Sequence, residues 1–292
     1  MAAPLSQVFS PANFQELFSY WDRFPKAKIF AGGVEQIRRQ GGRMLLLPPD
    51  IISLDKMEEL RRISRTERYL EIGAMVNLNQ IIHLGKIVPE ALIRCLESIS
   101  GPQLRNMATI GGNICNPSRR LDASAPMIAL DAHYELRTAQ AARWISASRF
   151  SSLPGPPVLG SREILTRIRV PLEPWTFTWY HKFSTPLSNE GGGGILFIIR
   201  NQKNILTDIR VVYSGKSILR EKDSETMLAG KHLPLDRKDA QAFIEKWKNY
   251  LSVFKGGNEK FIFGGDDRYS NPELIKAQIL NFIETTVMSI SD

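Results

Sequence analysis

Cysteine is scarce in this chain, which has two, Cys95 and Cys115, among its 292 residues. An iron–sulfur cluster usually takes about four cysteine ligands, so this chain cannot hold one alone. The four histidines are scattered, and neither a CxxC nor an HxxxH pair occurs, which argues against a structural zinc site. We therefore expect no metal ligands here and two ordinary thiols in a reducing compartment.

Long apolar runs are also missing. No stretch approaches the roughly 18 apolar residues of a membrane-spanning helix. The first residues, MAAPLSQVFSPANF, show no basic start followed by an apolar run, so no signal peptide is expected. With 43% hydrophobic and 23% charged residues the composition is that of a globular protein. These features predict a cytoplasmic protein without a membrane span.

The formal net charge of +8 raises the question of nucleic-acid binding. The basic residues are dispersed, however, and acidic residues lie among them: Arg61 and Arg62 follow Glu58 and Glu59 closely. No nucleic-acid-binding motif accompanies the charge. The pattern favours a solvated surface, or a docking face for an acidic partner, over a nucleic-acid interface.

Hydrophobic periodicity predicts a mixture of helices and strands, and hence an α+β fold. The expected helices are Asn13 to Trp21, Pro89 to Ser98, Ala125 to Leu130 and Pro272 to about Met288, the last with a buried stripe of Ile275, Ile279, Phe282, Ile283 and Val287. The expected strands are Ala27 to Phe30, Arg43 to Leu47, Tyr69 to Ala74, Ile164 to Val170, Gly194 to Ile199 and Ile205 to Tyr213. In Ile164 to Val170, alternation places Arg167 and Arg169 on one face and apolar residues on the other.

Two glycine-containing patterns resemble phosphate loops without being complete. Gly215-Lys216-Ser217 follows a strand, but a P-loop needs a further glycine five residues before Gly215, where Arg210 stands. No GxGxxG motif occurs, so a Rossmann dinucleotide site is unsupported. The run from Gly191 to Gly194 is more typical of a mobile loop than of a phosphate-binding one.

Two glycine pairs suit a nucleotide better, because each follows a short apolar run. They are Gly32-Gly33 and Gly111-Gly112, the second within Thr109-Ile-Gly-Gly-Asn113. Glycine pairs leave backbone N–H groups uncovered, and successive N–H groups can form an anion site. Thr109 and Asn113 add a hydroxyl and an amide, and Asp122 can accept hydrogen bonds from polyol hydroxyls. Either pair alone indicates a tight turn; both together favour a cofactor with a diphosphate and a polyol.

The segment Gln103-Leu-Arg-Asn-Met-Ala-Thr-Ile-Gly-Gly-Asn113 closely resembles the PQ(I/L)RN-x-(A/G)-TIGGN segment of the flavin (medium) subunits of molybdenum hydroxylases, the xanthine dehydrogenase and carbon monoxide dehydrogenase family. Nearly the whole chain takes part in the resemblance. The further matching segments are Ala31 to Gly33, Ile72 to Ala74, Ala129 to Ala132, Ile164 to Pro171 and Ser214 to Gly230.

The resemblance implies an FAD-binding fold of the vanillyl-alcohol oxidase-like (PCMH) type. It implies an FAD-binding domain over residues 1–174, with sub-domains of about 1–55 and 56–174, and a smaller α+β C-terminal domain over 175–292. By position it assigns the diphosphate to two loops, the ribityl chain to Asp122, and a place near the flavin ring to Lys182. The loop residues are Ala31, Gly32, Gly33, Val34, Glu35 and Gln36 in the first loop, and Thr109, Ile110, Gly111, Gly112 and Asn113 in the second.

The resemblance also implies an electron relay between subunits. A molybdopterin-binding large subunit would oxidise the substrate, a [2Fe–2S] small subunit would carry the electrons, and FAD on this chain would pass them to an acceptor such as NAD. No catalytic side chain is expected on this chain, because such a subunit holds and tunes its cofactor.

Some positions depart from the family pattern. The first loop continues Val34-Glu35 where the family usually has Thr-Asp or Thr-Asn, and Arg119 and Arg120 precede Asp122 where small residues are usual. Thr185-Pro186 occupies the place of an arginine that commonly follows Lys-Phe-Ser. These departures keep an alternative open: a scaffold subunit of the same fold with weakened or lost flavin binding.

Overall fold

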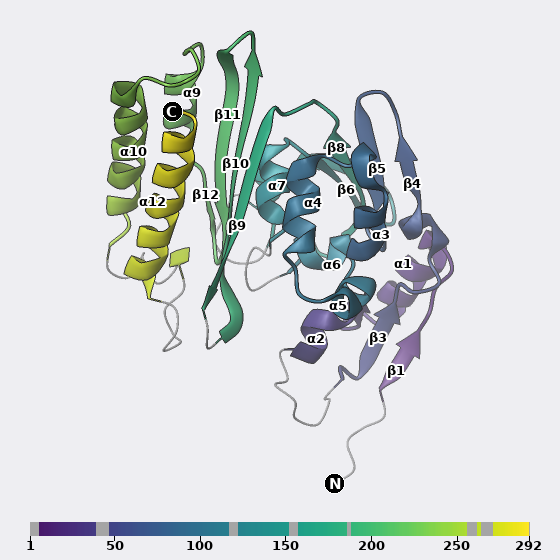
Figure 1. The fold of residues 1–292 in the computed structure, drawn as a ribbon. Helices are drawn as coiled ribbons and strands as arrows, with labels where there is room; N and C mark the ends of the chain where they lie inside the picture. The colour runs from purple at the N-terminus through teal and green to yellow at the C-terminus, as the bar shows by residue number, and fades with distance from the viewer. Residues whose placement is uncertain are drawn as a thin grey trace.

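The structure is a computed structural model that describes residues 6–38, 47–116, 122–151, 157–185, 188–255, 262–263 and 271–291. Three β-sheets follow one another along the chain, with helices packed around and between them (Figure 1). This arrangement confirms the α+β prediction. None of the helices in the described part of the chain combines the length and the apolar content needed to cross a membrane.

The first sheet is small and parallel, with strand order β1-β3-β2. Its strands are β1 (Gln7–Phe9), β2 (Lys28–Phe30) and β3 (Asp50–Ser53), and its helices are α1 (Phe14–Arg23) and α2 (Val34–Arg38). The helix predicted from Asn13 is confirmed, since the Asn13 side chain accepts a hydrogen bond from the Glu16 N–H and so caps α1. β2 leads directly into the first glycine pair.

The second sheet has five strands in the order β4-β5-β8-β6-β7, paired antiparallel. The strands are β4 (Ile63–Arg65), β5 (Tyr69–Gly73), β6 (His133–Arg137), β7 (Ala142–Ser146) and β8 (Ile164–Pro171). The helical segments beside them are η1 (Glu58–Arg61), α3 (Leu78–His83), η2 (Gly85–Ile87), α4 (Glu90–Glu97), α5 (Pro102–Met107), α6 (Ile110–Ile114), α7 (Ser124–Ala129) and α8 (Ala147–Phe150). The strands predicted at 69–74 and 164–170 and the helices predicted at 89–98 and 125–130 are confirmed.

The alternation predicted for β8 is confirmed by its ion pairs. Arg167 and Arg169 lie on the outer face, where Arg167 binds Glu135 at 2.7 Å and Arg169 binds Glu71 at 2.6 Å. Ile168 and Val170, on the other face, are fully buried. The outer face therefore neutralises its own charges across neighbouring strands.

The third sheet is buried on both faces. Its strands, in the order β12-β11-β10-β9, are β9 (Phe177–Thr185), β10 (Ser188–Gln202), β11 (Ile205–Ser214) and β12 (Ile218–Leu219). Leu196 and Ile198 join the core that contains α4 and α7, whereas Ile195, Phe197 and Ile199 join the core of the C-terminal helices. Because successive side chains of a strand point to opposite faces, this two-sided burial requires an uninterrupted apolar run.

The helices described after the third sheet are α9 (Lys222–Leu228), α10 (Arg237–Ser252) and α12 (Pro272–Ser289). α10 and α12 lie side by side on the outer face of that sheet (Figure 1). The predicted stripe of α12 is confirmed at Ile275, Ile279, Ile283 and Val287, which are buried; Phe282 is partly buried against the same core.

The strand expected at Arg43 to Leu47 falls largely outside the described residues and stays a prediction, and the sequence analysis missed β3, which follows Pro48-Pro49. One prediction about local structure needs correction. The glycine run from Gly191 to Gly194 was expected to form a loop but lies within β10. The reason is close packing between neighbouring strands: a Cβ on Gly194 would lie 2.2 Å from the Tyr180 hydroxyl.

A tryptophan in the segment between β8 and β9 fixes the third sheet against the second. The Trp175 ring lies 4.7 Å from the Arg200 guanidinium and 4.9 Å from that of Arg210. Arg210 also binds Asp131 at 2.5 Å and donates to the Ala129 carbonyl at the end of α7. The domain division near residue 174 stays a prediction, although the change from the second sheet to the third falls in this segment.

The Glu163–Arg143 pair provides a pH-dependent test of the second sheet. Two hydrogen bonds from Arg143, at 2.6 and 2.8 Å, lower the pKa of Glu163. A lowered carboxyl pKa contributes stability that is present above the unfolded-state pKa and is lost as pH falls through the folded-state pKa. We expect Glu163→Gln to reduce the free energy of unfolding near pH 7 by about 1–3 kcal/mol, and the difference from the parent chain to disappear once Glu163 is protonated.

Urea denaturation at several pH values measures this difference. Glu173→Gln is the matched control, because the Glu173 side chain also pairs with an arginine, Arg200, but is 62% exposed. An exposed pair contributes only about 0–1 kcal/mol. A Glu163→Gln effect that stays constant into acid would show that the carboxylate charge is not responsible.

Candidate functional site

The first glycine pair lies between β2 and α2, where the chain turns sharply. A Cβ on Gly32 would lie 1.8 Å from the carbonyl oxygen of Met107, at the end of α5. Gly33 has φ +71°, a conformation that L side chains rarely adopt. The two glycines are therefore needed for different reasons. Gly32 allows close contact with the Met107 carbonyl, two residues before the second loop, and Gly33 allows the turn into α2.

The second glycine pair forms the first turn of α6 rather than an open loop. Thr109 is the N-cap of this short helix, and its hydroxyl accepts a hydrogen bond from the Gly112 N–H at 3.1 Å. The N–H groups of Ile110 and Gly111 donate to the carbonyls of Val76 and Ala74. The expectation that this glycine pair leaves its backbone donors uncovered is therefore wrong, because the Gly111 N–H binds the Ala74 carbonyl and the Gly112 N–H binds the Thr109 hydroxyl.

Gly112 is the one residue of the Thr109–Asn113 segment with an exposed backbone position. A Cβ there would meet, within 4 Å, only the Thr109 hydroxyl oxygen, at 2.9 Å. The φ angle of Gly112 is not positive, so no special backbone conformation requires a glycine at this position. What its missing side chain provides is access to the Thr109 hydroxyl, which accepts from the Gly112 N–H and still has its own O–H to donate to an anion.

A hydrogen bond connects the second loop to Asp122. The Asn113 side-chain oxygen accepts from the Ala123 N–H at 3.3 Å, which places the neighbouring Asp122 beside α6. Asp122 in turn accepts from the Tyr180 hydroxyl at 3.2 Å and pairs with the Lys182 ammonium at 3.4 Å.

Lys182 and Tyr180 reach the site from β9, two residues apart and hence on the same face of the strand. Lys182 also donates to the Ser98 carbonyl just after α4, at 3.3 Å. Burial raises the pKa of Tyr180 well above its ordinary value, and the nearby Cys95 and Asp122 raise it further. Tyr180 therefore stays a neutral phenol that can donate to the Asp122 carboxylate.

The structure brings together the residues that the sequence analysis selected. Contacts run from Gly32 through Met107 to the Thr109–Asn113 turn, and from there through Ala123 and Asp122 to Lys182. Val34, Glu35 and Gln36 lie in α2, directly after the first glycine pair. The side chain of Ile110 points into the core and is fully buried. Arg119 and Arg120 lie outside the described residues.

The sequence analysis missed Tyr180, Ser98 and Met107 as parts of the site. The signal for Tyr180 was its position two residues before Lys182 in a strand, which puts both side chains on one face. Met107 contributes only a main-chain carbonyl at the site, so its side chain carried no signal. Ser98 contributes its carbonyl to Lys182 and its side chain to a hydrogen bond with Tyr180, and its distance along the chain from both residues concealed these contacts.

Comparison with known proteins agrees with this geometry. A family model described as the FAD binding domain in molybdopterin dehydrogenase matches residues 4–173. Quinoline 2-oxidoreductase from Pseudomonas putida 86 has the same fold, with a TM-score of 0.82 at 18% identity, covering 100% of this chain and 98% of that one. Carbon monoxide dehydrogenase from Hydrogenophaga pseudoflava gives a TM-score of 0.81 at 22% identity, covering 100% and 98%.

Sequence relatives carry related names. The xanthine dehydrogenase FAD-binding subunit of Escherichia coli O157:H7 is 33% identical over 157 residues, which span 51% of this chain and 52% of that protein. This match therefore covers about half the length of the relative. The nicotine 6-hydroxylase medium subunit of Paenarthrobacter nicotinovorans is 25% identical over 89% of this chain and 93% of its own.

The chain belongs to the family of FAD-binding domains of molybdopterin dehydrogenases. Its cofactor is FAD, and the described residues fit that molecule. Gly112 leaves open a space that a side chain would fill, α2 starts directly after Gly33, and a helix start is a favourable place for a phosphate. Asp122 supplies carboxylate oxygens of the kind that bind ribityl hydroxyls.

Gly32, which packs against the Met107 carbonyl, and Gly112, which is exposed, give a paired test. We expect Gly32→Ala to destabilise the apo protein, because its Cβ would press on the Met107 carbonyl. We expect Gly112→Val to lower FAD affinity at least about tenfold, which is about 1.4 kcal/mol, and to cost the apo fold only about 1 kcal/mol, the value of a weakened Thr109 cap. Flavin titration and thermal melting of the apo protein measure the two effects. A Gly112→Val chain with unchanged FAD affinity would make this glycine a purely structural residue.

The cysteine close to the second loop bears on how FAD is attached. Cys115 follows α6, and burial raises the pKa of its thiol to about 12. The thiolate is the nucleophilic form, so Cys115 is a poor candidate for a covalent flavin link. We expect acid precipitation of the FAD-loaded protein to leave all the flavin in the supernatant. Flavin that remains with the precipitated chain would contradict this, and a Cys115→Ser variant would then show whether Cys115 is the point of attachment.

Proposed function

We propose that this chain is the electron-transferring FAD subunit of a molybdenum hydroxylase assembly. In this proposal it receives electrons from a [2Fe–2S] cluster on a small partner subunit, while a molybdopterin-binding large subunit oxidises the substrate. NAD is the proposed final acceptor. The observation that carries the proposal is the continuous set of contacts from Gly32 to Lys182, which brings the exposed turn at Gly112, a carboxylate and an ammonium group to one place.

The need for partners follows from what the described residues lack. They contain no group of three or more His, Cys, Asp or Glu side chains able to hold a metal ion. Several relatives are named medium subunits or medium chains, among them the carbon monoxide dehydrogenase medium chain of Hydrogenophaga pseudoflava, 29% identical over 70% of this chain. Such names support an assembly in which other chains carry the metals.

Bound FAD supplies the ability to accept and return electrons, and the residues of this chain determine its surroundings. Lys182 is a cation held between the Ser98 carbonyl and Asp122, so it can stabilise negative charge beside it. The neutral Tyr180 donates to Asp122 and so holds that carboxylate in position. No described side chain is assigned an acid or base role.

A cytoplasmic location is part of the same proposal. Cys95 and Cys115 are free thiols, and Cys95 is buried. Burial, together with the nearby Asp122 carboxylate, raises the pKa of Cys95 well above its ordinary value. Two unpaired thiols are typical of a protein kept in a reducing compartment.

Two measurements test the proposal. Affinity capture of the chain from its native cell, followed by metal analysis, is expected to recover partner chains with iron and molybdenum. Anaerobic addition of NADH to the captured assembly is expected to bleach the visible flavin absorbance, since electron transfer between NAD and the flavin can run in both directions.

The outcomes separate the alternatives. Partners with iron and molybdenum but no flavin would favour a scaffold subunit. That alternative is suggested by Val34-Glu35, which stands where the family usually has Thr-Asp or Thr-Asn. Partners without either metal would overturn the electron-relay proposal. A flavin that is not bleached by NADH, but is bleached when the substrate-oxidising subunit is reduced, would exclude NAD as the acceptor and leave the relay intact.

A further inference from the structure

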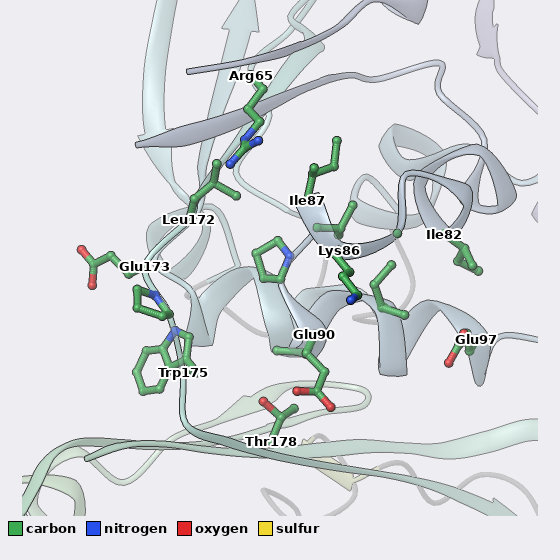
Figure 2. A pocket seen from close by; sticks show the side chains of 16 residues that line it. Arg65, Ile82, Lys86, Ile87, Glu90, Glu97, Leu172, Glu173, Trp175 and Thr178 are labelled. Atoms are coloured by element: carbon green, nitrogen blue, oxygen red, sulfur yellow. The ribbon is translucent and has the colours of Figure 1, made fainter. Parts of the chain in front are cut away.

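A second cavity lies away from the FAD site. It has a volume of about 670 Å³ and opens between the η2–α4 region and the segment that joins β8 to β9 (Figure 2). None of the residues assigned to FAD lines it. Ile87, Leu172, Pro174 and Trp175 give it apolar walls. The volume is within the range of about 300–1,000 Å³ that is usual for small-molecule sites.

Some of the charged side chains that line this cavity have ionic partners and others do not. Two of the lining carboxylates pair with arginines outside the lining: Glu90 with Arg94 at 2.6 Å, and Glu173 with Arg200 at 2.5 Å. The two lining cations, Arg65 and Lys86, pair with no carboxylate among the described residues. A third carboxylate, Glu97, lies well away from Arg65 in Figure 2. Arg65 and Lys86 are thus the two lining cations without an ionic partner in the described part of the chain, and the paired Glu90 carboxylate lies between Lys86 and Thr178 in Figure 2.

The start of α4 adds to this positive character. Pro89, Glu90 and Ala91 line the cavity, and Pro89 occupies the N-cap position without any side-chain cap. The first N–H groups of a helix have no intrahelical acceptor and carry a partial positive charge. At this end of α4 no side chain in the described part of the chain satisfies them as a cap.

A buried hydroxyl provides independent evidence for a ligand. Thr178, at the start of β9, lines the cavity and is 6% exposed, and its hydroxyl oxygen has no hydrogen-bond partner among the residues that the structure describes. Figure 2 shows Thr178 and Arg65 at opposite ends of the cavity, with Lys86 between them. A buried polar group without a partner costs about 1–3 kcal/mol, which a ligand oxygen at this position would offset.

We propose that this cavity binds an amphipathic organic anion. Its apolar body, of one or two rings or a short chain, lies between Ile87 and the Leu172–Trp175 segment. Its carboxylate or phosphate group is held by Lys86 and the start of α4, and Thr178 hydrogen-bonds a ligand oxygen. Arg65 provides a second cation at the far end. This site is independent of the proposed electron-relay function.

The test uses the full chain loaded with FAD, so that the flavin site is occupied. The probes are 2-naphthoate, 2-naphthyl phosphate and the neutral 2-naphthalenemethanol, with binding followed by calorimetry. We expect the anionic probes to bind, and the neutral one to bind at least about tenfold more weakly, which corresponds to about 1.4 kcal/mol. Whichever anion binds more tightly identifies the preferred head group.

Variants then locate the binding. Lys86→Gln and Thr178→Val are each expected to weaken 2-naphthoate binding about five- to tenfold, the range for one charge-assisted or buried hydrogen bond. Lys56→Gln removes an exposed lysine outside the cavity and is expected to change nothing. Thermal melting checks that each variant is folded. Equal binding of the neutral and anionic probes, unchanged binding by Lys86→Gln, or no binding at millimolar 2-naphthoate would each overturn the proposal.

Discussion

β10 is buried on both faces, and the position of the FAD site depends on that burial. Residues 195–199 alternate between two hydrophobic cores, one shared with α4 and α7 and the other with α10 and α12. Each fully buried apolar side chain contributes about 1.5–3 kcal/mol, so neither core can be lost without loss of the other. β9 pairs with β10 throughout this stretch. The register of these two strands therefore determines where Tyr180 and Lys182 lie relative to Asp122.

Within the site, small residues decide which groups a ligand can reach. Gly32 brings the first turn against the Met107 carbonyl, and Gly194 makes room for the Tyr180 ring that donates to Asp122. Main-chain hydrogen bonds hold the α6 turn in place, since the N–H groups of Ile110 and Gly111 donate to the carbonyls of Val76 and Ala74, just after β5. A rigid turn with one exposed position, at Gly112, is a preorganised contact that loses little freedom when a ligand arrives.

Many of the helices and strands, and the residues of the candidate site, could be predicted from the sequence. Period-two alternation identified β8 correctly, and helical spacing identified the buried stripe of α12, because burial imposes those periods directly. The glycine pairs and Asp122 predicted a site, which the structure brings together but does not test, and the resemblance added Lys182 and named the cofactor. The sequence could not show that Gly191–Gly194 is strand, because the cause is a Tyr180 ring on the neighbouring strand. Nor could it show that the donors of Ile110 and Gly111 bind carbonyls at positions 74 and 76, since main-chain carbonyls carry no residue identity.

The hydrogen bond between the Asn113 side chain and the Ala123 N–H has a consequence for how the two parts of the site are coupled. It joins α6 directly to the residue after Asp122, so the glycine turn and the carboxylate are held together by one side chain. A residue without a side-chain acceptor at position 113 would leave the turn and the Asp122 carboxylate without this direct connection, and the two would then be ordered separately when a ligand binds.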